Sequence, residues 1–286
     1  MPDPLEPLQY AFMVRAVAAA VLVGIVCAVV GVFVVLRGLA FLGDAIAHTA
    51  FPGVVAAYLL RADLVVGGTV AAVAGALAMG ALGRRVGLRE DAAIGVVFSG
   101  MFALGVVLFS GIRTFTGDLL GILLGNVVGV SEAQVVLVGA VVALVVAVVW
   151  LLWKELVFVT FDPTGAAAAG LRVGLYDALL LGLIGLAIAV SIQVVGIVLV
   201  VAMLVTPAAA ARLLTTRLDA MVALAVAVAV GSSVVGIYAS YWLNSASGGT
   251  IVLVATLVFA LASLVRLRPH AHLARDEGRP HHPYTH

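Results

Sequence analysis

Nine apolar stretches of span length, separated by short polar breaks, run along most of the chain. Their approximate ranges are 11–36, 39–60, 64–83, 92–110, 119–130 joined with 133–153, 176–192, 194–211, 220–243 and 250–265. An α-helix needs about 20 apolar residues to cross a bilayer. The pattern therefore predicts an all-α, polytopic bundle of about eight or nine membrane spans. The fifth stretch is open to two interpretations, a single interrupted span or a short re-entrant segment followed by a full span.

The composition supports a membrane protein and excludes several other classes. Of the 286 residues, 64% are hydrophobic and 10% are charged, whereas soluble domains carry about 25% charged residues. A net charge of +1 gives no indication of a nucleic-acid partner. The lone cysteine, Cys27, can form neither an internal disulfide nor a thiolate metal cluster.

The chain also lacks the phosphate loop of an ATPase. Its one lysine, Lys154, follows Trp153, whereas a GxxxxGK[ST] loop needs a lysine directly after a glycine. We therefore expect no Walker-type ATPase in this chain.

Basic residues favour the breaks after the odd-numbered stretches. Those breaks hold Lys154 and most of the arginines, whereas the breaks after the even-numbered stretches hold only Arg61 and Arg113. Because cytoplasmic loops of membrane proteins are enriched in basic residues, we expect the N-terminus outside and the C-terminus in the cytoplasm. The transmembrane domain covers 1–265.

A polar tail, 266–286, follows the last span. It contains a set of histidines: His270, His272, His281, His282 and His286. Histidine-rich tracts can bind metal weakly, but the tail has no helical pattern of apolar residues, and we expect it to be disordered.

The second stretch carries two polar side chains that membrane spans rarely hold. Asp44 and His48 are four residues apart and share one helix face. Because a charge inside the bilayer is costly, such residues usually face a bundle interior or a water-filled path. Their oxygen and nitrogen atoms suit zinc, manganese and iron. Two structural alternatives are a hydrogen bond that joins two helices and a pairing of Asp44 with Arg37.

Two ligands are too few for a tight metal site. A second copy of the chain, related by a two-fold axis, would supply another pair, and a loose shared site suits transport because the ion must leave again. Two proline motifs are expected to shape this pathway. Pro52 and Gly53 weaken the helix just after the polar pair, and Thr206 and Pro207 are expected to kink the stretch 194–211.

The loop 154–176 is expected to be cytoplasmic and to contain a short helix. Asp162 suits an N-cap and Pro163 the first helical position. Alanines, including Ala166, favour a helix that Gly170 would end. Such a helix is either a knob for a partner protein or an interfacial connector.

Several motifs together resemble the permeases of metal-ion ABC transporters of the zinc/manganese/iron type. The most specific are LGDAIAHTAFPGV at 42–54 and VVGIVLVVAMLVTPAAAARLL at 194–214. Further matches, in chain order, are DAAIGVVFSGMFALGVVL at 91–108, LLGNVVGV at 123–130 and FDPTGAAAAGL at 161–171. The resemblance covers about residues 12–265.

The resemblance implies a membrane subunit in the bacterial cytoplasmic membrane. As a membrane subunit the chain is expected to be a pore component and not an enzyme. Two permeases, identical or paralogous, would form the pore. A cytoplasmic ATPase dimer would bind ATP, and an extracytoplasmic metal-binding protein would deliver zinc, manganese or iron. No cofactor would be bound permanently. Asp44 and His48 match the pathway ligands of the family, and the segment with Asp162, Pro163, Ala166 and Gly170 matches its coupling helix.

Two other functions remain open at this point. One is an ABC permease whose cargo is a metal chelate, which would need a wider path and no ligand pair. The other is a proton- or sodium-coupled secondary carrier with Asp44 as the titrating group. Secondary carriers usually show internal repeats, and the chain has no convincing pair of halves.

Overall fold

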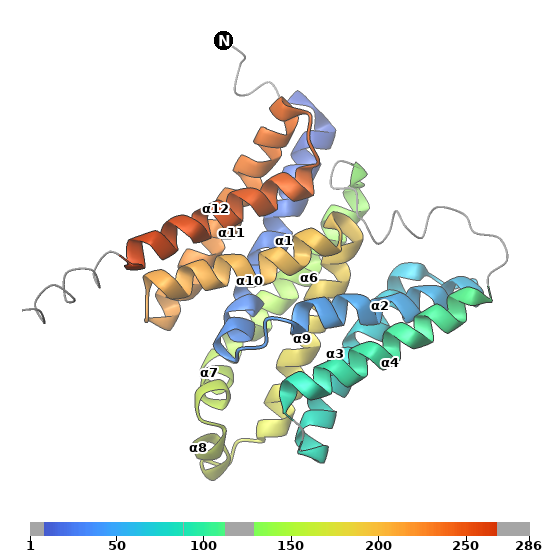
Figure 1. Cartoon of the computed structure of the whole chain (residues 1–286), viewed down its shortest axis with the longest axis vertical. Coiled ribbons are helices and arrows are strands. Elements are labelled where there is room, and N and C mark those ends of the chain that lie inside the picture. The colour runs from blue at the N-terminus through green and yellow to red at the C-terminus, as the bar shows by residue number, and fades with distance from the viewer. Residues whose placement is uncertain (1–8, 88, 112–128, 268–286) are drawn as a thin grey trace, which may run out of the picture.

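The computed structural model describes residues 9–87, 89–111 and 129–267, which are helical over most of their length with no β-strand among them (Figure 1). The helices are α1 (Ala11–Leu36), α2 (Leu42–Leu59), α3 (Leu64–Val86), α4 (Glu90–Ser110), α6 (Glu132–Leu151), α7 (Trp153–Phe161), α8 (Pro163–Ala168), α9 (Val173–Val195), α10 (Ile197–Leu214), α11 (Leu218–Leu243) and α12 (Ser247–Leu267).

The predicted spans are confirmed over the described residues. Eight of these helices are long and apolar enough to cross a membrane, namely α1, α3, α4, α6, α9, α10, α11 and α12. The ninth predicted span is α2, whose 18 residues include Asp44 and His48; these polar side chains reduce its mean hydropathy. The predicted piece at 119–128 and the histidines of the tail lie outside the described residues.

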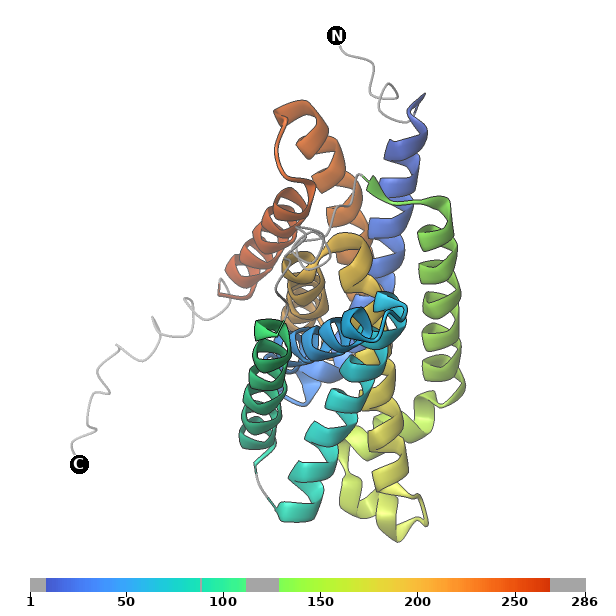
Figure 2. The same ribbon diagram turned by 90° about the vertical axis from the view of Figure 1, so that its right-hand side faces the viewer.

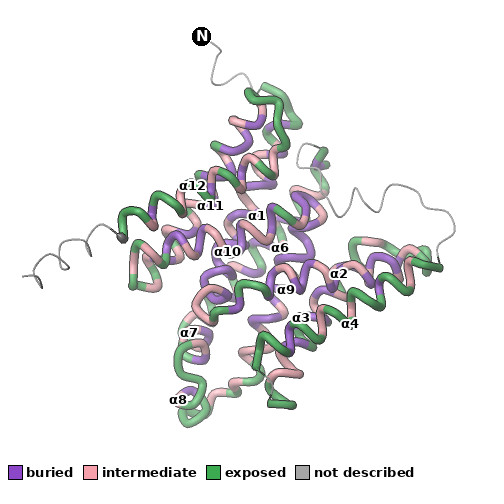
Figure 3. Tube along the Cα trace, viewed as in Figure 1, coloured by how far each residue is buried: buried purple, intermediate pink, exposed green. Residues whose placement is uncertain are grey.

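α1 and α9 form the centre of the bundle. α1 packs against α6, α9, α10 and α11, and α9 also packs against α3. Figure 2 shows α6 running beside α1. Buried residues gather along α1, α9 and α10, whereas α4 and α12 are exposed over much of their surface (Figure 3). Because the exposed residues of α4 and α12 are largely apolar, these surfaces suit lipid or another protein chain.

α2, α3 and α4 form one side group of the bundle (Figure 1). Gly53 of α2 and Gly67 of α3 face each other so closely that a Cβ atom at either position would collide with the other backbone. Small residues allow helices to approach in this way inside a membrane. α2 runs unbroken through Pro52 to Leu59, so any weakening by Pro52 and Gly53 does not end the helix.

The segment 154–176 is more helical than predicted. The expected short helix is present as α8, but Lys154–Phe161 is not a loop, because it belongs to α7. Leu156 and Val159, three residues apart, form the buried face of α7. Two apolar anchors in nine residues are too few to stand out as a helical period in the sequence.

Candidate functional site

Asp44 and His48 form the open face of an otherwise buried part of α2. Every other residue from Leu42 to Ala50 is buried, whereas the side chains of Asp44 and His48 are 47% and 33% exposed. Asp44 lies in the first turn of α2, where the helix dipole stabilises a negative charge. The fold therefore presents one carboxylate and one imidazole together at a surface.

The two side chains are spaced for a shared metal ion. Asp44 Oδ1 and His48 Nε2 lie 3.6 Å apart. Two atoms that are each about 2.1 Å from one metal, at a tetrahedral angle, lie about 3.4 Å from each other. The pair could therefore bind one ion with little side-chain movement. A hydrogen bond would be shorter, and both residues belong to α2, so the alternative of a hydrogen bond joining two helices is wrong.

Two aromatic rings of α4 contact the partly exposed imidazole. The His48 ring meets Phe98 at 5.5 Å and Phe102 at 5.7 Å between centroids, edge to face in both pairs. Phe102 also contacts Phe51 of α2. Edge-to-face contacts of this kind favour the observed orientation of the imidazole. The sequence does not mark the two phenylalanines of α4 as part of the site, because an aromatic residue in an apolar span is ordinarily explained by packing or lipid contact.

Asp44 also lines an open groove of about 580 Å³ between α2 and α4. Asp91, near the start of α4, lines the same groove, together with Phe98. The sequence alone does not mark Asp91 as part of this site. The groove gives the carboxylate of Asp44 access to water.

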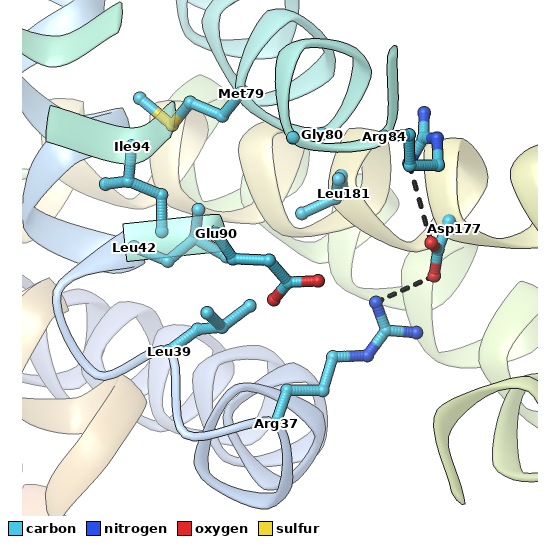
Figure 4. Close-up of a pocket in the computed structure, with 11 residues that line it drawn as sticks. Arg37, Leu39, Leu42, Met79, Gly80, Arg84, Glu90, Ile94, Asp177 and Leu181 are labelled. Atoms are coloured by element: carbon cyan, nitrogen blue, oxygen red, sulfur yellow. Dashed lines mark hydrogen bonds and ion pairs between the residues drawn. The ribbon is translucent and has the colours of Figure 1, made fainter. Parts of the chain in front are cut away.

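The predicted alternative partner of Asp44 is bound elsewhere. Arg37 forms an ion pair with Asp177, with 2.8 Å between Nη1 and Oδ1, and donates a hydrogen bond from Nη2 to Thr160 Oγ1 at 3.2 Å. The pairing of Arg37 with Asp44 is therefore wrong. Figure 4 shows Arg37 and Arg84 converging on Asp177. Asp177 could have been noticed as the only acidic residue in α9.

The described part of one chain brings only these two ligands together. Within the ranges that the structure describes, no group of three or more His, Cys, Asp or Glu side chains is placed to hold a metal ion. Two protein ligands leave at least two positions of a four-coordinate ion open. A tighter site would need ligands from another molecule.

The prolines predicted to shape the pathway are buried between packed helices. Pro52 is buried, and its missing N–H leaves the His48 carbonyl without its usual helical donor. Pro207 is buried within a continuous α10, and Thr206 is half-buried. Thr206 and Pro207 are not among the described residues that line the groove beside Asp44. Their role in a pathway stays a prediction.

The predicted features of α8 are present in the fold. Asp162 is its N-cap and accepts a hydrogen bond from Gly165 N at 2.8 Å. Pro163 is the first residue of the helix, and Ala166 is its buried residue. Gly170 follows the helix with φ +86°, a conformation that favours glycine. The helix lies at one end of the molecule (Figure 1).

Comparison with known proteins identifies related chains over nearly the whole length. The model of the ABC 3 transport family matches residues 9–266. The manganese transport system membrane protein MntC of Halalkalibacterium halodurans is 45% identical over 255 residues, which are 89% of this chain and 87% of that protein. The chelated iron transport system membrane protein YfeD of Yersinia pestis is 39% identical over 257 residues, 90% of this chain and 86% of that protein.

A solved structure has the same fold. PsaBC from Streptococcus pneumoniae, in complex with a Fab, matches with a TM-score of 0.79 and 35% sequence identity. The match covers 91% of this chain and 94% of the other.

Proposed function

This chain belongs to the ABC 3 transport family, and we propose that it is the membrane permease of an ATP-driven importer of manganese or ferrous iron. The observation that carries the proposal is the pairing of Asp44 Oδ1 with His48 Nε2 at 3.6 Å on the one uncovered face of a buried helix segment. The relatives named for manganese and iron transport support the choice of cargo.

The ion passes between two permease subunits. The exposed faces of α2 and α4 meet a second copy or a paralogue, and each subunit contributes one carboxylate and one imidazole. Four ligands from two chains hold the ion loosely, because separation of the subunits removes half of them. Carboxylate and imidazole ligands suit both manganese and ferrous iron.

A separate ATPase dimer drives the cycle. We assign the arginine-rich ends of the helices to the cytoplasm, which places α8 where a cytoplasmic ATPase can bind it. A metal-binding protein delivers the ion from the other side of the membrane. α8 is suited to a docking role because its cap at Asp162 and its stop at Gly170 define a short rigid element.

A metal chelate is the second candidate cargo. The name of the Yersinia pestis relative refers to chelated iron, and the groove of about 580 Å³ beside Asp44 is large enough for more than a bare ion. We favour the free ion because the metal in a chelate is already coordinated and would not need Asp44 and His48 as ligands.

Reconstitution in liposomes tests the function. The chain is assembled with its ATPase and binding protein, and uptake of radioactive manganese is measured with and without internal ATP. We expect ATP-dependent uptake that free ferrous iron inhibits. Uptake that follows a proton or sodium gradient without ATP would support a secondary carrier. Inhibition by an iron chelate but not by free ions would support the second cargo.

A further inference from the structure

Four charged residues meet at the end of the bundle next to α2. Arg37 follows the last residue of α1, Arg84 lies in the last turn of α3, and Asp177 lies near the start of α9. Asp177 forms ion pairs with both arginines, through Oδ1 with Arg37 at 2.8 Å and through Oδ2 with Arg84 at 3.5 Å. Glu90, the first residue of α4, lines the same pocket of about 170 Å³ (Figure 4).

Arg37 connects this cluster to the segment formed by α7 and α8, which we call the α7–α8 arm. Its Nη2 donates to Thr160 Oγ1 at 3.2 Å. Thr160 lies in the last turn of α7, two residues before Asp162, the N-cap of α8. Because α7 and α8 pack against each other and against α9, a displacement of α8 moves Thr160 relative to Arg37.

Arg37 also lies one short turn away from the metal ligands. Gly38 has φ +73° and redirects the chain, Leu39 is buried, and α2 begins at Leu42 with Asp44 in its first turn. A shift of the Arg37 backbone therefore reaches Asp44 through a short segment that the buried Leu39 anchors in the core.

The cluster has an unused donor and a second acceptor. Among the described residues, Arg37 Nε is buried without a hydrogen-bond partner, although buried donors are nearly always paired. The carboxylate of Glu90 points into the same pocket but makes no ion pair within the described ranges. Two carboxylates and two guanidiniums sum to zero charge. Because Glu90 is exposed and Asp177 is also paired with Arg84, Arg37 can exchange Asp177 for Glu90 without leaving Asp177 unpaired.

We propose that Arg37 is a positioning residue for transport, which passes the displacement of the α7–α8 arm to Asp44. In the state described here it is held by Thr160 and Asp177. When the α7–α8 arm withdraws, the guanidinium of Arg37 moves to Glu90. The first turn of α2 moves together with Arg37. This inference rests on the proposed function, because it assumes that a partner moves α8.

The substitution T160V tests the link with little change in shape. It removes the Thr160 hydroxyl that accepts the hydrogen bond from Arg37 Nη2, and it leaves the ion pair between Arg37 and Asp177 in place. The assembled transporter with its ATPase is reconstituted in liposomes, and three quantities are measured: manganese imported per ATP hydrolysed, the half-saturating manganese concentration, and thermal stability. T256V is the matched control, because the Thr256 hydroxyl bonds only within α12, to Val252 O.

We expect T160V to lower the number of ions imported per ATP by about tenfold, the effect of losing a hydrogen bond to a charged group. The half-saturating concentration and the stability should stay those of the wild type. T160S, which keeps the hydroxyl, should restore coupling. E90Q should slow ATP-driven import in the same way, again with an unchanged half-saturating concentration.

Three results would overturn the proposal. T160V could import as many manganese ions per ATP as T256V does. Alternatively, the half-saturating manganese concentration of T160V could rise in proportion to the loss of transport, which would indicate a deformed metal site. E90Q could import at the wild-type rate, which would remove the exchange step. A wild-type transporter without ATP-dependent uptake would instead refute the proposed function, and this inference with it.

Discussion

Asp44 Oδ1 and His48 Nε2 lie 3.6 Å apart on successive turns of α2, and they are the two residues between Leu42 and Ala50 that neighbouring helices leave uncovered. The separation is close to that of two ligands on one ion. Burial around the pair holds the helix in place, and partial exposure leaves the ligand atoms accessible.

Conservative changes at the pair should abolish transport without unfolding the chain. D44N keeps the size of the side chain but removes its charge, and H48Q removes the imidazole. Loss of a protein ligand or its charge should reduce metal uptake at least about tenfold. Uptake is measured in liposomes, with thermal unfolding in detergent as a check on folding.

The control for these variants is D219N. Asp219 also lies in the first turn of a span, α11, and is exposed, so D219N tests loss of a carboxylate at a similar helix position. It should transport as the wild type does. Normal uptake by both D44N and H48Q would remove this pair from the pathway.

The rings around His48 should affect metal affinity more than stability. F102L removes an edge-to-face contact with the imidazole at 5.7 Å, and such contacts contribute about 0.5–1.5 kcal/mol. With the imidazole free to rotate, we expect the half-saturating metal concentration to rise about two- to tenfold. F259L, on α12, is the matched control. Equal affinities for the two variants would argue against an orienting role for Phe102.

The spans were predictable because the bilayer imposes both their length and their composition. Apart from the piece at 119–130, the predicted and observed ends differ by at most three residues. The pair at Asp44 and His48 was also predictable, since a charge inside an apolar stretch needs a reason. The sequence does not reveal α7, because the polar residues Lys154 and Glu155 near its start are typical of the end of a span. Its nine residues are also too few to show a helical period of apolar positions.

The surroundings of the site depended on contacts between distant parts of the chain. In the sequence, Arg37 is closer to Asp44 than to any other acid after the first span. In the fold it faces Asp177, because Gly38 turns the chain and α9 packs beside α1. Phe98 and Phe102 contact His48 only because α4 packs on α2. Sequence pattern alone specifies neither neighbour.

The cap of α8 provides a test of its coupling role. D162A removes the acceptor of the bond from Gly165 N and should destabilise the first turn of α8 by about 1 kcal/mol. A frayed α8 should dock poorly, so we expect ATP hydrolysis to be largely uncoupled from import. D162N is the matched variant, because asparagine caps about as well as aspartate, and it should remain coupled.

The comparison separates two roles of the aspartate. Loss of coupling in both variants would show that the charge of Asp162, rather than its cap, serves the partner. Normal coupling in D162A would argue against α8 as the docking element. Coupling is measured as metal imported per phosphate released.

The contact between Gly53 and Gly67 should make the α2–α3 pair sensitive to a single methyl group. In G53A the new Cβ would meet the carbonyl oxygen of Gly67, so the helices must separate. Overpacking of this kind typically costs about 1–3 kcal/mol, and the loss should appear as a lower unfolding temperature in detergent. G100A is the control, because a Cβ at Gly100 meets no atom within 4 Å, and alanine favours a helix by up to about 1 kcal/mol. A G53A protein as stable as G100A would show that α2 and α3 can move apart at no cost. Close packing against α3 would then not be what holds α2, and with it Asp44 and His48, in position.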